Sequence, residues 1–148
     1  MASVFYNYAK KKLCDGTVAY LTDTIKVMLV SSAYVPNADH EFVSSITNSP
    51  SSELSGTGYV AGFGGAGRKA LATKAINVDL VNDRAEFDGG DLTWSSINAG
   101  TIAYLVLIEE VVSDTASHLI CAIDIGTQAT NGGDITVTWN AEGIFQLT

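Results

Sequence analysis

The side chains that could carry out nucleophilic or acid–base chemistry are few in this chain and lack a catalytic spacing. Ser117 and His118 lie next to each other near Asp114, but the members of a catalytic triad converge in space and are seldom sequence neighbours. The sequence contains no G-x-S-x-G nucleophile motif. Two adjacent acids, Glu109 and Glu110, would point to opposite faces of a strand, which is wrong for a carboxylate pair. We therefore predict a non-enzymatic protein with no catalytic residues.

Metal ligands are equally sparse. His40 and His118 are the only histidines, and their separation does not fit a zinc site. Four oxygen-bearing residues beside glycines could bind calcium, namely Asp88, Asp91, Asn131 and Asp134. The EF-hand spacing is absent, however, and Asp or Asn next to Gly is ordinary turn chemistry. The sequence predicts no metal and no cofactor.

Residues 62–67 (GFGGAG) match the dinucleotide-binding pattern G-x-G-x-x-G, with Asp88 downstream. That pattern binds a pyrophosphate only where a buried strand precedes it and a helix follows it. Here only a short apolar stretch, residues 59–61, comes before, and the chain that follows alternates like a strand. We therefore expect a flexible glycine loop, which a partner could order.

The composition fits one β-rich domain that meets a partner. The chain has 148 residues, of which 47% are hydrophobic and 16% are charged. That is enough chain to bury a core without metals or disulfides, and the high apolar fraction suggests a partner-facing surface. No apolar run approaches the roughly 18 residues that span a bilayer. No apolar signal-peptide segment follows the lysines at 10–12, so we expect the protein to fold where it is made, in a reducing cytoplasm, with no membrane contact. We expect Cys14 and Cys121 to be buried free thiols, with a disulfide or metal pair as the alternatives.

The formal net charge of −8 is unevenly placed. Residues 1–74 carry five acids and seven bases, whereas residues 75–148 carry eleven acids and one base. So acidic a second half repels phosphate backbones, and nucleic acid is not an expected partner. We expect this half to face solvent.

The hydrophobic pattern predicts a mainly β fold. Residues 102–108 (IAYLVLI) form the longest apolar run and predict a central strand buried on both faces. The glycine-rich turn at 88–91 upstream predicts a hairpin or a corner. Further strands are expected at 24–30, 76–80, 118–125, 135–139 and 144–147, and a short helix at 40–46. These elements predict an antiparallel β-sandwich or barrel of about seven to nine short strands with one or two short helices.

We expect a single β-domain over residues 1–148 with an N-terminal arm, about residues 1–15. Residues 4–13 could form one or two amphipathic turns. Two interpretations stay open. The segment is either a solvated helix end whose aromatic residues pack on the sheet, or an arm that reaches a neighbouring subunit.

Several phrases of the sequence carry a resemblance when taken together: YNYAKKKLCDG at 6–16, DTIKVMLV at 23–30, GTGY at 56–59, NDRAEFD at 82–88 with LTW at 92–94, and WNAEGI at 139–144. Over nearly the whole chain this resembles small virion structural proteins of tailed double-stranded DNA bacteriophages, of the capsid decoration (cement or head-stabilising) type.

The resemblance implies a protein of the virion surface that binds the major capsid protein of the mature head, often as a homotrimer. The residues we expect to face the capsid or a neighbouring subunit are Phe5, Tyr6, Tyr8, Lys10, Lys11, Lys12, Tyr34 and Phe63. The alternative is a tail or head-fibre module that binds a receptor or carbohydrate through exposed aromatic residues such as Trp94 and Trp139. A third hypothesis, a small hydrolase, would need His118 or a carboxylate pair in a cleft.

Overall fold

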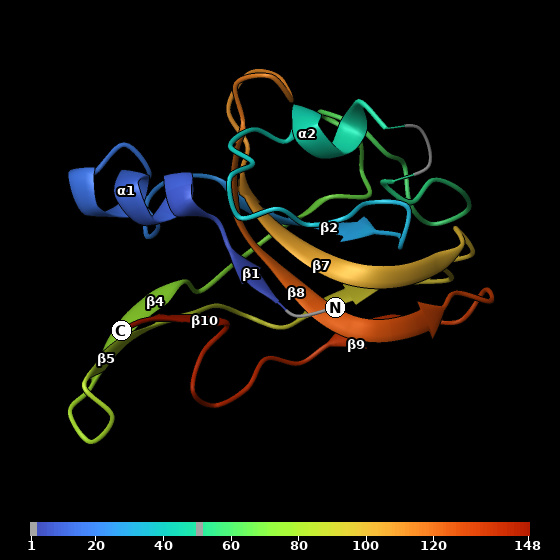
Figure 1. Ribbon diagram of the computed structural model, residues 1–148. Coiled ribbons are helices and arrows are strands. Elements are labelled where there is room, and N and C mark those ends of the chain that lie inside the picture. The colour runs from blue at the N-terminus through green and yellow to red at the C-terminus, as the bar shows by residue number, and fades with distance from the viewer. Residues whose placement is uncertain (1–2, 50–51) are drawn as a thin grey trace.

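The computed structural model describes residues 3–49 and 52–148 and is built on one curved antiparallel sheet (Figure 1). This main sheet has five strands in the order β1-β8-β7-β2-β3. Their bounds are Val4–Phe5 (β1), His118–Ala129 (β8), Thr101–Glu109 (β7), Ile25–Val30 (β2) and Lys69–Ala70 (β3). The helix α2, Ser44–Thr47, lies above the sheet, and two smaller sheets lie below it. The expected mainly β, antiparallel, sandwich-like fold is confirmed.

The long apolar run forms the centre of this sheet. β7 pairs with β2 on one side and β8 on the other, so that Leu105 stands opposite both Leu29 and Ile123. All residues of β7 after Thr101 are buried. A strand covered on both faces has no solvent side, which is why its sequence is continuously apolar rather than alternating.

The lower layer consists of a three-stranded and a two-stranded sheet. The first has the order β10-β5-β4 and the second pairs β6 with β9. Their bounds are Ala75–Asp79 (β4), Arg84–Asp88 (β5), Leu92–Trp94 (β6), Ile135–Val137 (β9) and Phe145–Leu147 (β10). The turn at 88–91 is therefore a corner between two sheets and not a hairpin. The two similar segments of sequence, DGGDLTW at 88–94 and NGGDITVTW at 131–139, pair with each other through β6 and β9.

The N-terminal segment is part of the folded body. β1 pairs with β8, and the helix α1, Asn7–Asp15, follows and packs against β8. Between them, the Tyr6 side chain is fully buried. Gly16 ends α1 with φ 77°, a left-handed conformation that glycine adopts without steric cost. In this chain the first of the two interpretations holds for the aromatic residue Tyr6, which packs into the core.

Three local expectations were wrong. The helix expected at 40–46 is shorter and begins later, at Ser44–Thr47, because residues 37–40 form a turn closed by the His40 N–H to the Asn37 carbonyl, and Phe42 makes an isolated bridge to His118 of β8. The strand expected to be half-buried at 76–80 is β4, but its apolar side chains face solvent: Val78 is 72% exposed. Both cysteines are free, but only Cys121 is buried, and Cys14 lies at the surface of α1. Burial raises the pKa of the Cys121 thiol to about 12.

Candidate binding surface

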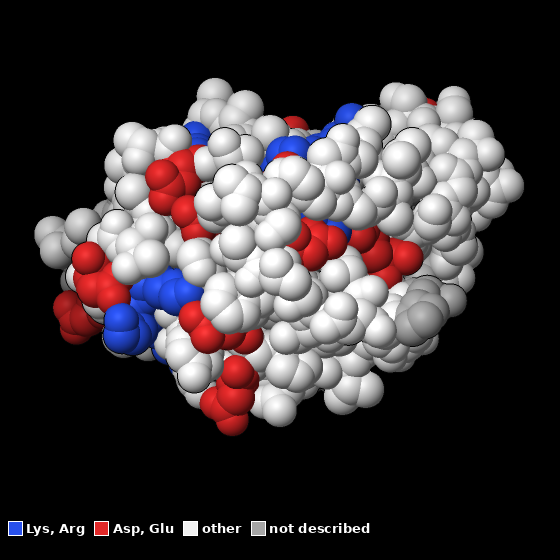
Figure 2. All heavy atoms as spheres, turned by 90° about the horizontal axis from the view of Figure 1, so that it is seen from above, with Lys and Arg blue, Asp and Glu red and all other residues white. Residues whose placement is uncertain are grey.

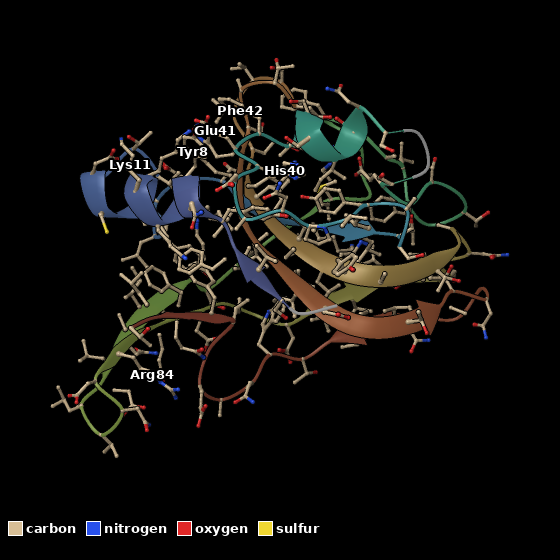
Figure 3. All side chains as sticks on the ribbon, viewed as in Figure 1. Tyr8, Lys11, His40, Glu41, Phe42 and Arg84 are labelled. Atoms are coloured by element: carbon tan, nitrogen blue, oxygen red, sulfur yellow. The ribbon has the colours of Figure 1, made fainter. Side chains whose placement is uncertain are left out.

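The helix α1 and residues 37–42 form one continuous face, which we call the α1 face. The Asn7 N–H donates to the Ala38 carbonyl at 2.8 Å, and the Asn7 amide donates to Asp39 at 2.9 Å. The Lys12 ammonium donates to Glu41 at 2.7 Å. Figure 3 shows Tyr8, Lys11, His40, Glu41 and Phe42 at this end of the molecule. Because the Leu119 N–H of β8 donates to the Glu41 carbonyl and Phe42 bridges to His118, the face is fixed to the main sheet.

Three of the residues expected to contact a partner are buried instead. Tyr6 and Tyr34 are 0% and 3% exposed. Lys12 is also buried, and its ammonium forms an ion pair with Glu41. The Tyr6 and Tyr34 hydroxyls hydrogen-bond at 2.9 Å, and the Tyr34 hydroxyl contacts His40 Nδ1 at 2.8 Å. Burial raises the pKa of both tyrosines, so both stay neutral. We correct the assignment: these side chains hold the α1 face together and do not present themselves to a partner.

Two of the expected residues do lie at the surface of this face. Tyr8 is 43% exposed, and the Lys11 side chain is 71% exposed. Lys11 donates to Asp15 at 2.6 Å, and this bond, with help from Thr17, holds the pKa of Asp15 below its ordinary value. Such an exposed ion pair between positions i and i+4 contributes little to stability. Lys11 is therefore available to a partner.

The remaining expected residues are placed apart from Tyr8. Phe5 is half-buried, with its ring 5.2 Å from the ring of Phe145, and Lys10 lies over the Phe5 ring at 5.5 Å. Phe63 is 46% exposed at the tip of the glycine loop, whose Gly62 N–H donates to Glu53. The structure thus brings Tyr8 and Lys11 together but carries Phe63 on another element.

A buried ionic network anchors that glycine loop. The Arg68 side chain is completely buried and donates two hydrogen bonds to Glu53 and two to Asp114, at 2.6–3.1 Å. Glu110 lies 3.5 Å from Arg68 and also pairs with Lys26. Burial alone would lower the pKa of Arg68. The hydrogen bonds that Arg68 donates to Glu53 and Asp114 outweigh this effect, so the pKa of Arg68 is raised overall. At the surface seen from above, acidic and basic atoms also lie close together near the middle of the molecule (Figure 2). This network ties loops to the sheet, and the buried Glu110 Oε2 beside Arg68 accepts no hydrogen bond within it.

The residues considered for catalysis diverge. Ser117 Oγ donates to the Ser113 carbonyl, His118 bonds to Glu109, and Asp114 bonds to Arg68. No triad forms from them. Within residues 3–49 and 52–148, no group of three or more His, Cys, Asp or Glu side chains is placed to hold a metal ion.

A groove of about 710 Å³ lies between β8 and β9. Its walls are mainly apolar, with Ile123 and Ile125 on one side and Val137 and Trp139 on the other. Asp134 is the one ionisable residue among those that line it, and it accepts a hydrogen bond from the Ser96 N–H. Among the described residues that line this groove there is therefore no acid–base pair.

The two tryptophans considered for carbohydrate binding are both used internally. Trp94 is 0% exposed and donates from its indole to the Gly67 carbonyl at 2.6 Å. Trp139 is half-buried and donates to the Gly90 carbonyl at 3.0 Å. The glycine-turn repeats thus place one indole in the core and one at its margin, and they do not form a paired aromatic platform at the surface.

No family model, curated protein or solved structure matches this chain. In the part of the chain that the structure describes, the helices are too short to cross a membrane. The exposed surfaces of the chain therefore carry the functional information. The sequence pointed to Tyr8 and Lys11, but it missed His40, Glu41 and Phe42 as members of the same face. The available signal was the pair of acids Asp39 and Glu41, whose charge is opposite to that of the lysines although they lie far from them in sequence.

Proposed function

We propose that this chain is a non-enzymatic decoration protein of a tailed-phage head, which binds the major capsid protein at the surface of the mature shell through the α1 face. The observation that carries the docking site is the exposure of Tyr8 beside Lys11 on a helix that buried Tyr6 holds in place. The resemblance of the sequence to such virion proteins supplies the identity of the partner.

The chemistry of the α1 face suits a protein–protein contact. Tyrosine is enriched among the residues that dominate interface energetics, since its large ring is buried at a small entropic cost. A fixed helix also loses little freedom on binding, which leaves more of the contact energy for affinity. Lys11 at the rim would steer the approach to an acidic surface and fix the orientation.

Decoration would stabilise the shell by mass action. A protein that binds only the mature lattice shifts the equilibria of expansion and rupture by its binding free energy. In the homotrimer that the resemblance implies, one bound subunit raises the effective concentration of the other two, so modest contacts add up to tight binding.

The test is co-sedimentation of the purified protein with mature heads of its own phage that lack it. We expect binding by the unaltered chain and about a tenfold loss of affinity for Tyr8→Ala, as for a central interface residue. Thr127→Ala, at an exposed position near the far end of β8, is the matched control and should bind normally. Absence of binding by the unaltered chain would reject the proposal, and normal binding by Tyr8→Ala would reject the α1 face.

A further inference from the structure

The hairpin formed by β4 and β5 carries apolar side chains into solvent. Val78, Leu80 and Val81 are 72%, 83% and 90% exposed. β4 is an edge strand of its sheet in the described structure, and the hairpin projects away from the body at the lower left of Figure 1. Proteins normally shield such edges with charges, proline or bulges, because an open apolar edge invites association.

The apolar side chains of β4, Ile76 and Val78, belong to a single apolar face, which Leu80 and Val81 follow in the turn. Residues directly opposite each other in an antiparallel pair lie on the same side of the sheet. Val78 faces Ala85 and Ile76 faces Phe87 in the register of β4 and β5. Phe87 in turn faces Phe145 of β10, with their rings stacked at 4.5 Å.

The molecule covers only half of this face. The ring of Tyr20 packs edge-on against Phe87 at 5.2 Å and against Phe145 at 5.6 Å. Beyond these rings the face continues to Val78 without cover. The opposite face of the hairpin is polar, with Arg84 paired to Asp79 and Glu86, and Figure 3 shows Arg84 on this projecting element. The hairpin is thus amphipathic, and the outer half of its apolar face is exposed to solvent.

An apolar groove adjoins the same face. It has a volume of about 480 Å³ and runs between the segment that ends α1 and the strands of the small sheet. Leu13, Val18 and Leu21 line it from the first side, and Ile76 and Leu147 from the second. Leu21 is 52% exposed within it. The exposed apolar face of the hairpin and the apolar groove therefore lie next to each other on one chain.

The charges of the two elements are complementary. Residues 75–88, which form the hairpin, contain four acids and one base, a net charge of −3. Residues 7–15, which form α1 above the groove, contain three lysines and one acid, a net charge of +2. Because Lys12 is held by Glu41, Lys10 and Lys11 supply the accessible positive charge.

We propose that the occupant of this groove is the β4–β5 hairpin of a second copy of the chain. Val78 and Leu80 of one copy would enter the groove beside Leu21 of the next, with the acidic hairpin lying against the basic helix. A surface that carries both halves of a contact is what a closed symmetric oligomer requires. The apolar residues Leu21, Ile76, Val78, Leu80 and Val81 are 42–90% exposed, and covering them would supply part of the about 800 Å² per partner in a standard interface.

This inference concerns self-association and does not depend on capsid binding. The test is light scattering coupled to size exclusion, applied to the full chain. We expect a mass of two or three times the 15.6 kDa of the chain. Val78→Glu and Leu21→Glu, each at an exposed position, should both reduce it to that of one chain. Unaltered circular dichroism would show that both variants are folded.

A mixing experiment separates this contact from a general loss of solubility or shape. Val78→Glu keeps an intact groove and Leu21→Glu keeps an intact hairpin, so the two variants mixed should recover a species of two chains. Val35→Glu, 62% exposed on another loop, is the matched control and should assemble like the unaltered chain. A monomeric unaltered protein, or an oligomer unaffected by Val78→Glu, would overturn the proposal.

Discussion

At the level of single residues, the charges of this chain are used mainly inside it. Arg68 is the clearest case, since an arginine with no solvent contact is held by two acids and lies near a third. The sequence offered no sign of this, because Glu53, Arg68 and Asp114 are far apart along the chain. Ion pairs of this kind depend on the tertiary fold and have no local period to detect. The same reason explains why Lys12 was expected at the surface and was found bound to Glu41.

Arg68→Met should therefore destabilise the protein strongly. The substitution keeps much of the side-chain volume but leaves the carboxylates of Glu53 and Asp114 without their buried partner. Removing one member of a buried ion pair costs about 3–5 kcal/mol of the free energy of unfolding. Urea denaturation followed by circular dichroism measures this loss. Lys11→Met, which breaks an exposed pair, is the control and should leave the midpoint unchanged. Equal midpoints for both variants would mean that the network does not hold the loops.

At the level of elements, the sequence pattern identified strands more reliably than their environment. The apolar run of β7 and the pattern of β2 correctly marked the centre of the sheet. The alternation at 76–80 correctly indicated a strand, but alternation tells only that two faces differ. It cannot tell whether the apolar face is covered, and in β4 the chain leaves it open. The helix expected at 40–46 was too long, because the turn at 37–40 and the bridge between Phe42 and His118 hold the chain before Ser44, and both depend on the tertiary fold.

The glycine loop shows a second limit of pattern reading. Of the three glycines in the G-x-G-x-x-G pattern, Gly62 and Gly64 have positive φ values of 89° and 73°, whereas Gly67, like the neighbouring Gly65, has a packing explanation. A side chain on Gly67 would meet the ring of Tyr59 at 2.5 Å, and one on Gly65 would meet the Val60 carbonyl at 2.4 Å. The Tyr59 ring cannot shift easily, because its hydroxyl accepts from the Leu29 N–H and donates to Glu53.

Gly67→Ala should accordingly lower the free energy of unfolding by about 2 kcal/mol, in the range for overpacking a well-packed site. Thermal unfolding measures the change as a drop in the melting temperature. Gly133→Ala is the control, because an added methyl group there meets nothing closer than 3.5 Å. Its expected effect is below about 0.5 kcal/mol. If both variants melted like the unaltered protein, close packing would not explain the glycines.

At the level of the whole molecule, the composition and the structure agree on one point. A chain with 47% hydrophobic residues and a net charge of −8 gathers its buried apolar side chains in one cluster but leaves a stripe along β4 and the adjoining turn uncovered. The sequence indicated an excess of apolar surface, and only the structure locates it. A rigid sheet with an uncovered edge element suits a component of an assembly better than an isolated monomer.

Hydrogen exchange should resolve these two parts of the molecule. Backbone amides of β7 are bonded within the sheet on both sides and buried, so they should open only on global unfolding and exchange slowest. Amides of β4, an exposed edge strand, should exchange rapidly in dilute protein. If copies associate through the hairpin, protection of β4 must rise with protein concentration while that of β7 stays constant, because only the former is coupled to assembly. Mass spectrometry of peptides covering residues 75–79 and 101–109 over a wide range of concentration measures both. A β4 that is equally protected at every concentration would place the contact between copies elsewhere on the molecule.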